Sequence, residues 1–225
     1  ILNLSLKWEK NPYTIMFNAN GGKGKMKDQS VESDTDIKLN ENAFTKADCH
    51  FVGWNTEKDG SGDSYENGEE INNLVNPDED ITLYAQWEDD KYTIKYDANS
   101  GKGKMDNVLV KTSDNVTLVN NDFTKEGYHF TGWNTKANGT GDNFTEGQDV
   151  KGLGVNEETV TLYAQWKANT YTIIFNGNGH TNLSESMDNQ TFTYDSELKA
   201  LSVNKFERAG YDFLGWSTDK NAKVA

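Results

Sequence analysis

The sequence TLYAQW at residues 82–87 is followed almost at once by YTIKY at residues 92–96, and this pair of stretches recurs along the chain. The second pair is TLYAQW at 161–166 and YTIIF at 171–175, and a degenerate pair, LSLKW at 4–8 and YTIMF at 13–17, opens the chain. Self-similarity at a fixed period is the sequence signature of a repeat protein. Each pair therefore marks the end of one repeat and the beginning of the next.

The period is 79 residues, which is the spacing between Trp87 and Trp166. Trp133 and Trp216 lie 83 residues apart, so the third repeat has 83 − 79 = 4 extra residues. The spacing predicts the closing strand of a preceding repeat at 1–12, repeat 1 at 13–91, repeat 2 at 92–170 and a truncated repeat 3 at 171–225. Because Ile1 is not a natural start, we expect the chain to be a fragment of a longer protein.

Within each repeat the hydrophobic residues alternate with polar ones. Tyr13, Ile15 and Phe17 fall on one face of an extended chain, which indicates a half-buried β-strand. Gly/Asn-rich turns follow, and a second strand is predicted at about 29–39. A short helix is expected at most near 40–47 or 69–75. The predicted fold class is therefore mainly β, or α+β at most.

Aromatic residues recur at fixed places in each repeat, and we expect them to form the structural core. A unit of 79 residues without a disulfide buries a limited area, so large aromatic side chains must supply much of it. The predicted core residues are Tyr13, Phe17, Phe44, Trp54, Trp87, Tyr92, Phe123, Tyr128, Trp133, Trp166, Tyr171, Phe206, Tyr211 and Trp216. The single cysteine, Cys49, is expected to be a small buried filler rather than a reactive thiol.

The net charge of −14 limits the classes of partner. Nucleic acids, anionic lipids and sulfated glycans need a basic surface, so none of them is an expected partner. No apolar run reaches the roughly 18 residues of a membrane span, so membrane insertion is not expected.

No motif points to an enzyme. His50 and His129 occupy the same place in repeats 1 and 2, beside the GYxF motif, and are interpreted as residues at the edge of a strand. The acidic clusters at 78–80 and 88–90 have the hard oxygen ligands that calcium prefers. They lack the spacing of a calcium loop, and repeat 2 does not keep them. We expect no catalytic residue, no metal and no cofactor, although a calcium site in repeat 1 stays open.

The ordered motifs YTIxF, GxGxM, GYxFxGWNT, GxGxxYxxG and LYAQW resemble the Listeria–Bacteroides repeat family, also called the internalin B-type repeat. The resemblance covers nearly the whole chain. It implies tandem modules with a small β-grasp-like, ubiquitin-like fold. It also implies an extracellular location on a bacterial cell surface, with a cell-wall or membrane anchor in segments outside this chain, and no catalytic residues.

Two functions remain open at this point. The first is a stalk or spacer that presents another domain away from the cell, and the second is an adhesive module that binds a host protein or glycan. Linkers of only four residues, 88–91 and 167–170, predict a semi-rigid rod in which neighbouring repeats are each other's partners. Residues 2–8 alternate like a closing strand, so we also expect weak head-to-tail self-association.

Overall fold

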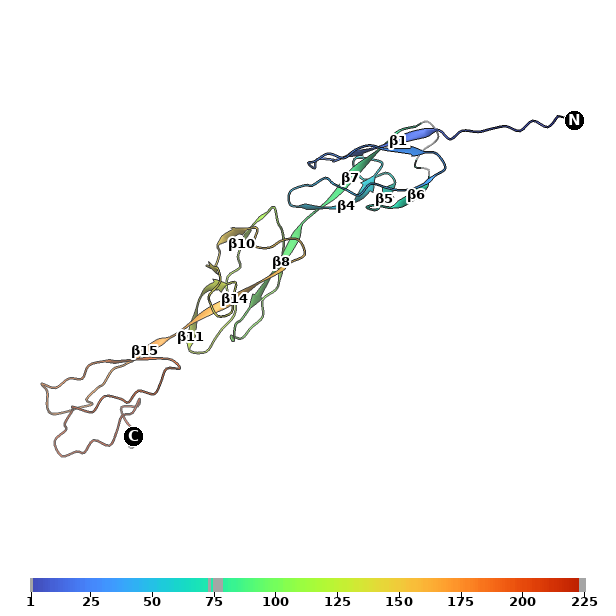
Figure 1. Ribbon diagram of the computed structural model, residues 1–225. Helices are drawn as coiled ribbons and strands as arrows, with labels where there is room; N and C mark the ends of the chain where they lie inside the picture. Colours follow the sequence, from blue (N-terminus) through green and yellow to red (C-terminus); the bar gives the residue numbers. More distant parts are fainter. Residues whose placement is uncertain (1, 73, 75–78, 223–225) are drawn as a thin grey trace. The chain divides into compact units, whose positions relative to one another are not determined.

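The computed structural model describes residues 2–72, 74 and 79–222, and these residues form strands, turns and loops with no helix. They divide into two compact units; unit 1 contains the boundary between repeats 1 and 2, and unit 2 contains that between repeats 2 and 3. Unit 1 comprises residues 1–95, 107–118 and 149–160, and unit 2 comprises residues 96–106, 119–148 and 161–225. Figure 1 shows the strands, coloured by residue number from the N-terminus to the C-terminus.

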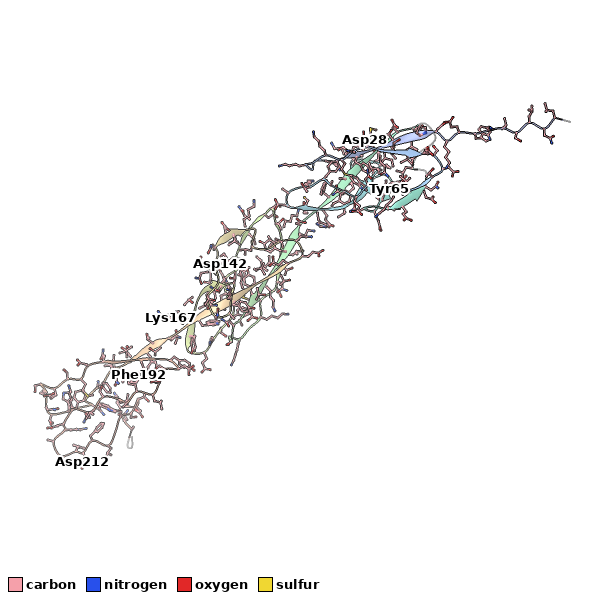
Figure 2. The ribbon with its side chains drawn as sticks, in the orientation of Figure 1. Asp28, Tyr65, Asp142, Lys167, Phe192 and Asp212 are labelled. Carbon is pink, nitrogen blue, oxygen red and sulfur yellow. The ribbon has the colours of Figure 1, made fainter. Side chains whose placement is uncertain are left out.

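Repeat 1 is built on a five-stranded sheet with the order β2-β1-β7-β4-β5. Its strands are β1 (Pro12–Asn18), β2 (Gln29–Glu32), β4 (Cys49–Asn55), β5 (Ser64–Tyr65) and β7 (Ile81–Asp89). The first and last strands, β1 and β7, are parallel neighbours at the centre, and the other pairings are antiparallel. Figure 1 shows β1, β4, β5 and β7 together in the N-terminal unit, and Figure 2 places Tyr65 of β5 there.

The second strand predicted at 29–39 is in fact two strands in two different sheets. β2 ends at Glu32, Asp34 takes a positive φ of 56°, and β3 (Asp36–Lys38) then pairs with β6 (Glu70–Asn72). The turn at Asp34 breaks the strand because a left-handed residue cannot continue an extended ladder.

The prediction of, at most, a short helix near 40–47 or 69–75 is wrong for the described residues. Residues 40–47 form loop and bridges, and residues 70–72 are strand β6. Positions 73 and 75 lie outside the described residues.

Repeat 2 repeats the pattern with the strand order β12-β11-β14-β8-β9 and a separate pair, β10 with β13. Its strands are β8 (Lys91–Asp97), β9 (Val108–Lys111), β10 (Asn115–Thr117), β11 (Tyr128–Asn134), β12 (Asn143–Phe144), β13 (Asp149–Lys151) and β14 (Thr159–Ala168). A register shift between Phe130 and Gly132 interrupts the pairing of β11 with β14, as one between Phe51 and Gly53 does in repeat 1.

Repeat 3 has one strand pair, β15 (Thr170–Ile173) with β16 (Gln190–Thr193). Its remaining described residues, 174–189 and 194–222, form turns, bends and loops but no strands. Within the described part of repeat 3, no strand occupies the position that β7 holds in repeat 1.

Candidate functional site: the junctions between repeats

The tryptophan of the GYxFxGW region lies at the centre of each core. Trp54 is fully buried, and its ring centroid lies 4.9 Å from Phe17, 4.9 Å from Phe51 and 6.2 Å from Phe44. Trp133 is also fully buried, and it contacts Tyr96, Phe123 and Phe130 with similar geometry. Edge-to-face and tilted ring pairs of this kind stabilise a small core beyond the area they bury.

The predicted core residues divide into three groups. The buried ones are Tyr13, Phe44, Trp54, Tyr92, Phe123 and Trp133. The half-buried ones are Phe17, Trp87, Tyr128, Trp166, Phe206 and Trp216. The exposed ones are Tyr171, at 53%, and Tyr211, at 67%. The interpretation of Tyr171 and Tyr211 as core residues is therefore wrong: Tyr171 stacks on Phe192 at 5.5 Å, and Tyr211 lies 4.2 Å from the guanidinium of Arg208, both at the surface.

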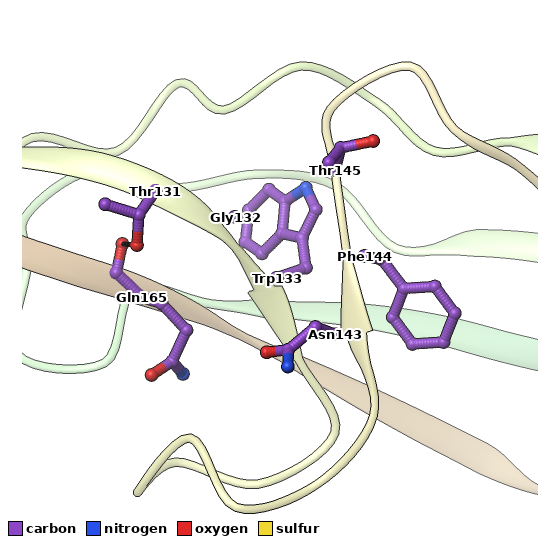
Figure 3. Close-up of a pocket in the computed structure, with 7 residues that line it drawn as sticks. All are labelled: Thr131, Gly132, Trp133, Asn143, Phe144, Thr145 and Gln165. Carbon is purple, nitrogen blue, oxygen red and sulfur yellow. Dashed lines mark hydrogen bonds between the residues drawn. The ribbon is translucent and has the colours of Figure 1, made fainter.

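The pocket in Figure 3 lies between β11, β12 and β14. Gly132 and Trp133 of β11, Phe144 of β12 and Gln165 of β14 line it. Thr131 Oγ1 donates to the carbonyl of Gln165 across it at 3.2 Å. Its volume is about 170 Å3. Small-molecule sites usually measure about 300–1,000 Å3, so we assign no ligand to this pocket.

The linker between repeats 1 and 2 is held from both sides through Asp90. Its N–H donates to the carbonyl of Asp48 in repeat 1 at 2.9 Å, and its carbonyl accepts from Thr112 N–H in repeat 2 at 2.9 Å. Two neighbouring contacts add to this: Lys91 N–H donates to Asn156 Oδ1 at 3.0 Å, and its carbonyl accepts from Glu157 N–H at 2.7 Å. The linker is therefore an ordered strand segment that both repeats share.

Asn169 holds the linker between repeats 2 and 3 from both sides in the same way. Its N–H donates to the carbonyl of Gly127 at 2.8 Å, and its carbonyl accepts from Tyr194 N–H at 2.8 Å. At the start of the chain, the carbonyl of Asn11 accepts from Ser33 N–H at 2.9 Å. One backbone arrangement is thus repeated wherever one repeat follows another.

His50 and His129 contact the linker residues Asp90 and Asn169, so both histidines belong to the junctions between repeats. His50 Nδ1 lies 2.8 Å from Asp90 Oδ1, and His129 Nδ1 lies 2.7 Å from Asn169 Oδ1. Asn156 of repeat 2 approaches His50 Nδ1 at 3.4 Å. The interpretation as strand-edge residues missed this role, although the shared place of the two histidines was a usable signal.

A salt bridge also joins repeats 1 and 2, with Lys111 Nζ 2.7 Å from Asp89 Oδ2. The hydrogen bond and charge of Lys111 hold the pKa of Asp89 below its usual value, and Asp89 raises the pKa of Lys111. Cys49 Sγ points to Asp89 Oδ1 at 3.8 Å, and burial raises the pKa of the Cys49 thiol. Both groups of the ion pair are exposed, so its contribution to stability is small.

Tyr128 belongs to the second junction rather than to a core. Its ring lies edge-on to Tyr194 at 5.8 Å, and its hydroxyl donates to Asp195 Oδ2 at 3.1 Å. That hydrogen bond raises the pKa of Tyr128. Lys125 Nζ lies 4.4 Å above the same ring. The tyrosine that sequence analysis placed in the core of repeat 2 thus contacts repeat 3.

The calcium hypothesis finds no support among the described residues, where no group of three acidic, histidine or cysteine side chains is placed to hold a metal. Asp78 lies outside the described residues, and Asp80 Oδ1 accepts a hydrogen bond from Thr14 N–H at 2.7 Å. Across the part of the chain that the structure describes, no helix is long and apolar enough to cross a membrane.

Repeated mixed sheets joined by shared linker residues define a tandem β-repeat protein. The family model described as the Listeria-Bacteroides repeat domain matches residues 13–86, 92–165 and 171–225. The chain therefore belongs to the Listeria-Bacteroides repeat family, which confirms the resemblance seen in its motifs.

Three curated relatives extend this result. A protein of Evansella cellulosilytica whose name describes a Gly-rich membrane protein is 37% identical over 76% of this chain and 19% of its own length. A second Evansella protein, also named for the membrane, is 30% identical over 98% of the chain and 31% of its length. Internalin H of Listeria monocytogenes is 33% identical over 76% of the chain and 29% of its length. The chain thus spans less than a third of the length of each of these relatives.

Proposed function

We propose that this chain is a non-catalytic stalk, which holds another domain of its parent protein away from a bacterial cell. One observation carries the proposal: the linker residues Asp90 and Asn169 are hydrogen-bonded through their backbones to the repeats on both sides. A linker held in this way resists bending, whereas a flexible linker leaves its backbone groups to water. Three repeats in series would then form a semi-rigid rod.

The proposed module is β-grasp-like. Support comes from the sheet order, in which the first and last strands of repeat 1 are parallel and central and short antiparallel strands flank them. A β-grasp fold packs a helix across such a sheet. Here β3 and its loops lie between β2 and β4 in the chain, and β3 pairs with β6 in a small separate sheet.

The proposed location is outside the cell, on a surface to which other parts of the parent protein are anchored. The relatives named for the membrane and the internalin support this location. The acidic balance of the chain, −14, suits a solvent-exposed spacer that does not adhere to nucleic acid or anionic lipid.

The stalk is tested by measuring the distribution of distances between neighbouring repeats. Spin labels on Val52 and on its equivalent Thr131, both exposed, in a Cys49→Ser background should give one narrow distance distribution by pulsed electron resonance. Inserting Gly-Gly-Ser-Gly after Asp90 is the matched control and should broaden it. Equal, broad distributions for both proteins would refute the stalk.

The adhesive alternative gives a separate readout. A glycan array and host extracellular matrix proteins should bind the chain no better than they bind an unrelated acidic protein. Saturable binding that is lost on substitution of exposed residues would favour an adhesive module.

A further inference from the structure

Three Asn-Gly pairs occur in repeats 1 and 2, and the structure holds them in different ways. The pairs are Asn20-Gly21, Asn67-Gly68 and Asn138-Gly139. The side-chain amide of an asparagine that precedes glycine can react with the main-chain nitrogen of that glycine, because no β-carbon shields the nitrogen. In a folded protein the reaction depends on the backbone conformation of the asparagine and on the hydrogen bonds of its amide. The three pairs differ in both respects.

Asn20 is held in a conformation that opposes the reaction. Its φ is 47°, in the left-handed region, where ψ is typically about +47°. At that ψ the nitrogen of Gly21 points away from the Asn20 side chain, nearly opposite its β-carbon. The amide nitrogen Nδ2 also donates to the carbonyls of Lys58 and Ala85, both at 2.9 Å, so it is not free to leave. The amide of Asn20 is therefore protected as long as repeat 1 is folded.

Asn67 is exposed in a tight turn that Glu69 N–H closes by donating to the carbonyl of Glu66 at 3.3 Å. Its φ is negative, unlike that of Asn20. Its Oδ1 accepts a hydrogen bond from Asn42 N–H at 2.8 Å. A donor to this oxygen draws electron density from Cγ, the atom to be attacked, and stabilises the negative charge that develops on the oxygen. The contact that orients the Asn67 side chain thus also favours attack on it.

The equivalent turn of repeat 2 carries an acid in the place of Asn67. Glu146 stands 79 residues after Asn67, and its Oε1 accepts from Asn121 N–H at 2.7 Å, as Asn67 accepts from the matching N–H of repeat 1. Lys38 Nζ lies beside the turn of repeat 1, 3.5 Å from the position of a β-carbon on Gly68, so its charge would offset a new negative charge. A carboxylate at position 67 therefore fits the turn and keeps its hydrogen bond.

Asn138 shows the same relationship with the two repeats exchanged. Its equivalent in repeat 1 is Asp59, and both side chains accept from the N–H two residues further on, at 3.2 Å for Asn138 and 3.1 Å for Asp59. The N–H of Gly139, however, donates to the carbonyl of Lys136 at 3.0 Å, and this bond must break before the nitrogen can attack. Asn138 should therefore react more slowly than Asn67.

We propose that Asn67 is a site of spontaneous deamidation in the folded chain, in a turn that accepts the acidic product, with Asn138 as a slower second site and Asn20 protected. The nitrogen of Gly68 loses its proton and bonds to Cγ of Asn67, and the Cγ–Nδ2 bond breaks to release ammonia. Water then opens the resulting succinimide ring at one of its two carbonyls and leaves aspartate or isoaspartate. One water is consumed, one ammonia is released, and nothing is oxidised or reduced. Each event adds one negative charge to the chain.

The full chain is tested by peptide mapping with mass spectrometry after incubation at about pH 8 and about 25 °C, in buffer and in guanidinium chloride. In the denaturant the three Asn-Gly pairs should deamidate at similar rates, because the fold no longer distinguishes them. In buffer Asn67 should deamidate at least about tenfold faster than Asn20, whose reaction requires local unfolding, with Asn138 between them. Equal rates at Asn67 and Asn20 in buffer, or an Asn67 that stays intact in buffer while it reacts in the denaturant, would overturn the proposal.

Variants that carry the aspartate product test whether the turn accepts it. Asn67→Asp and Asn138→Asp should unfold at the same urea concentration as the wild type, because the other repeat already holds an acid at each place. Asn20→Asp is the matched control and should unfold at a lower urea concentration, because a carboxylate cannot donate to the carbonyls of Lys58 and Ala85. A loss for Asn67→Asp as large as that for Asn20→Asp would overturn the claim that the turn accepts the product.

Discussion

The ring of Tyr194 lies against Gly127 so closely that a β-carbon on Gly127 would overlap it. At the preceding junction the same two places are held by Asp48 and Thr112, and Asp48 keeps a positive φ of 56°. The larger residue, Asp48, is thus paired with the small Thr112, whereas Gly127 is paired with the large Tyr194. The two positions are matched within each junction.

Gly127→Ala should destabilise the second junction. Gly127 has a φ of +76°, so alanine there costs about 1 kcal/mol in backbone strain, and the overlap with Tyr194 adds to it. Gly210→Ala is the matched control, because Gly210 has a φ of +77° and open space around it. Urea unfolding should show a loss for Gly127→Ala of about 2 kcal/mol or more, against about 1 for the control. Tyr194→Thr in the Gly127→Ala protein should recover most of the difference, and no recovery would contradict the steric account.

Trp133→Ala should lower the free energy of unfolding of repeat 2 by about 3–5 kcal/mol, the range for truncating a buried aromatic. Repeats 1 and 3 should keep most of their structure, because the stability of a repeat is largely local. Trp8→Ala is the control, since Trp8 is 88% exposed, and it should change stability by less than about 0.5 kcal/mol. Amide exchange read repeat by repeat measures both effects, and equal losses for the two variants would disprove the burial argument.

Asn99→Gly should destabilise repeat 2 through lost hydrogen bonds alone. Asn99 has a φ of 47°, which glycine adopts without strain. Its Nδ2 donates to the carbonyls of Ala137 and Ala164, both at 2.8 Å. Losing them should cost about 1–3 kcal/mol in thermal or urea unfolding. Asn178→Gly, which removes a bond to Lys220 only, should cost less, and the reverse order would contradict this account.

The Lys111–Asp89 pair should make the first junction sensitive to acid. Because Lys111 depresses the pKa of Asp89 in the folded state, the pair stabilises the junction above the ordinary aspartate pKa of about 3.9. The contribution is lost as the pH falls through the lower, folded-state pKa. In Lys111→Met, the carboxyl resonance of Asp89 should titrate at a higher pH by NMR, close to that of a free aspartate. Lys58→Met is the control and should leave it unchanged; an unchanged Asp89 titration in Lys111→Met would show that the pair does not form in solution.

The sequence predicted the elements that depend on local pattern. Alternation around Ile15 and Leu83 located strands β1 and β7, and both residues are fully buried. The turn at Asp34, by contrast, divided the predicted strand at 29–39, because the period-two pattern continues across a single left-handed residue. Similarly, no local signal shows that β3 pairs with β6 in a sheet of its own.

The amino-acid sequence by itself determined that this is a tandem repeat of the Listeria-Bacteroides family, with its period and its β-rich units. These properties follow from residue type and spacing along one chain. Only the tertiary structure decided that Tyr128 and His50 serve the junctions and that Asp90 and Asn169 are shared between repeats. Those contacts join residues that are distant in the chain, and their partners become adjacent only after each sheet has formed and the next repeat has packed beside it.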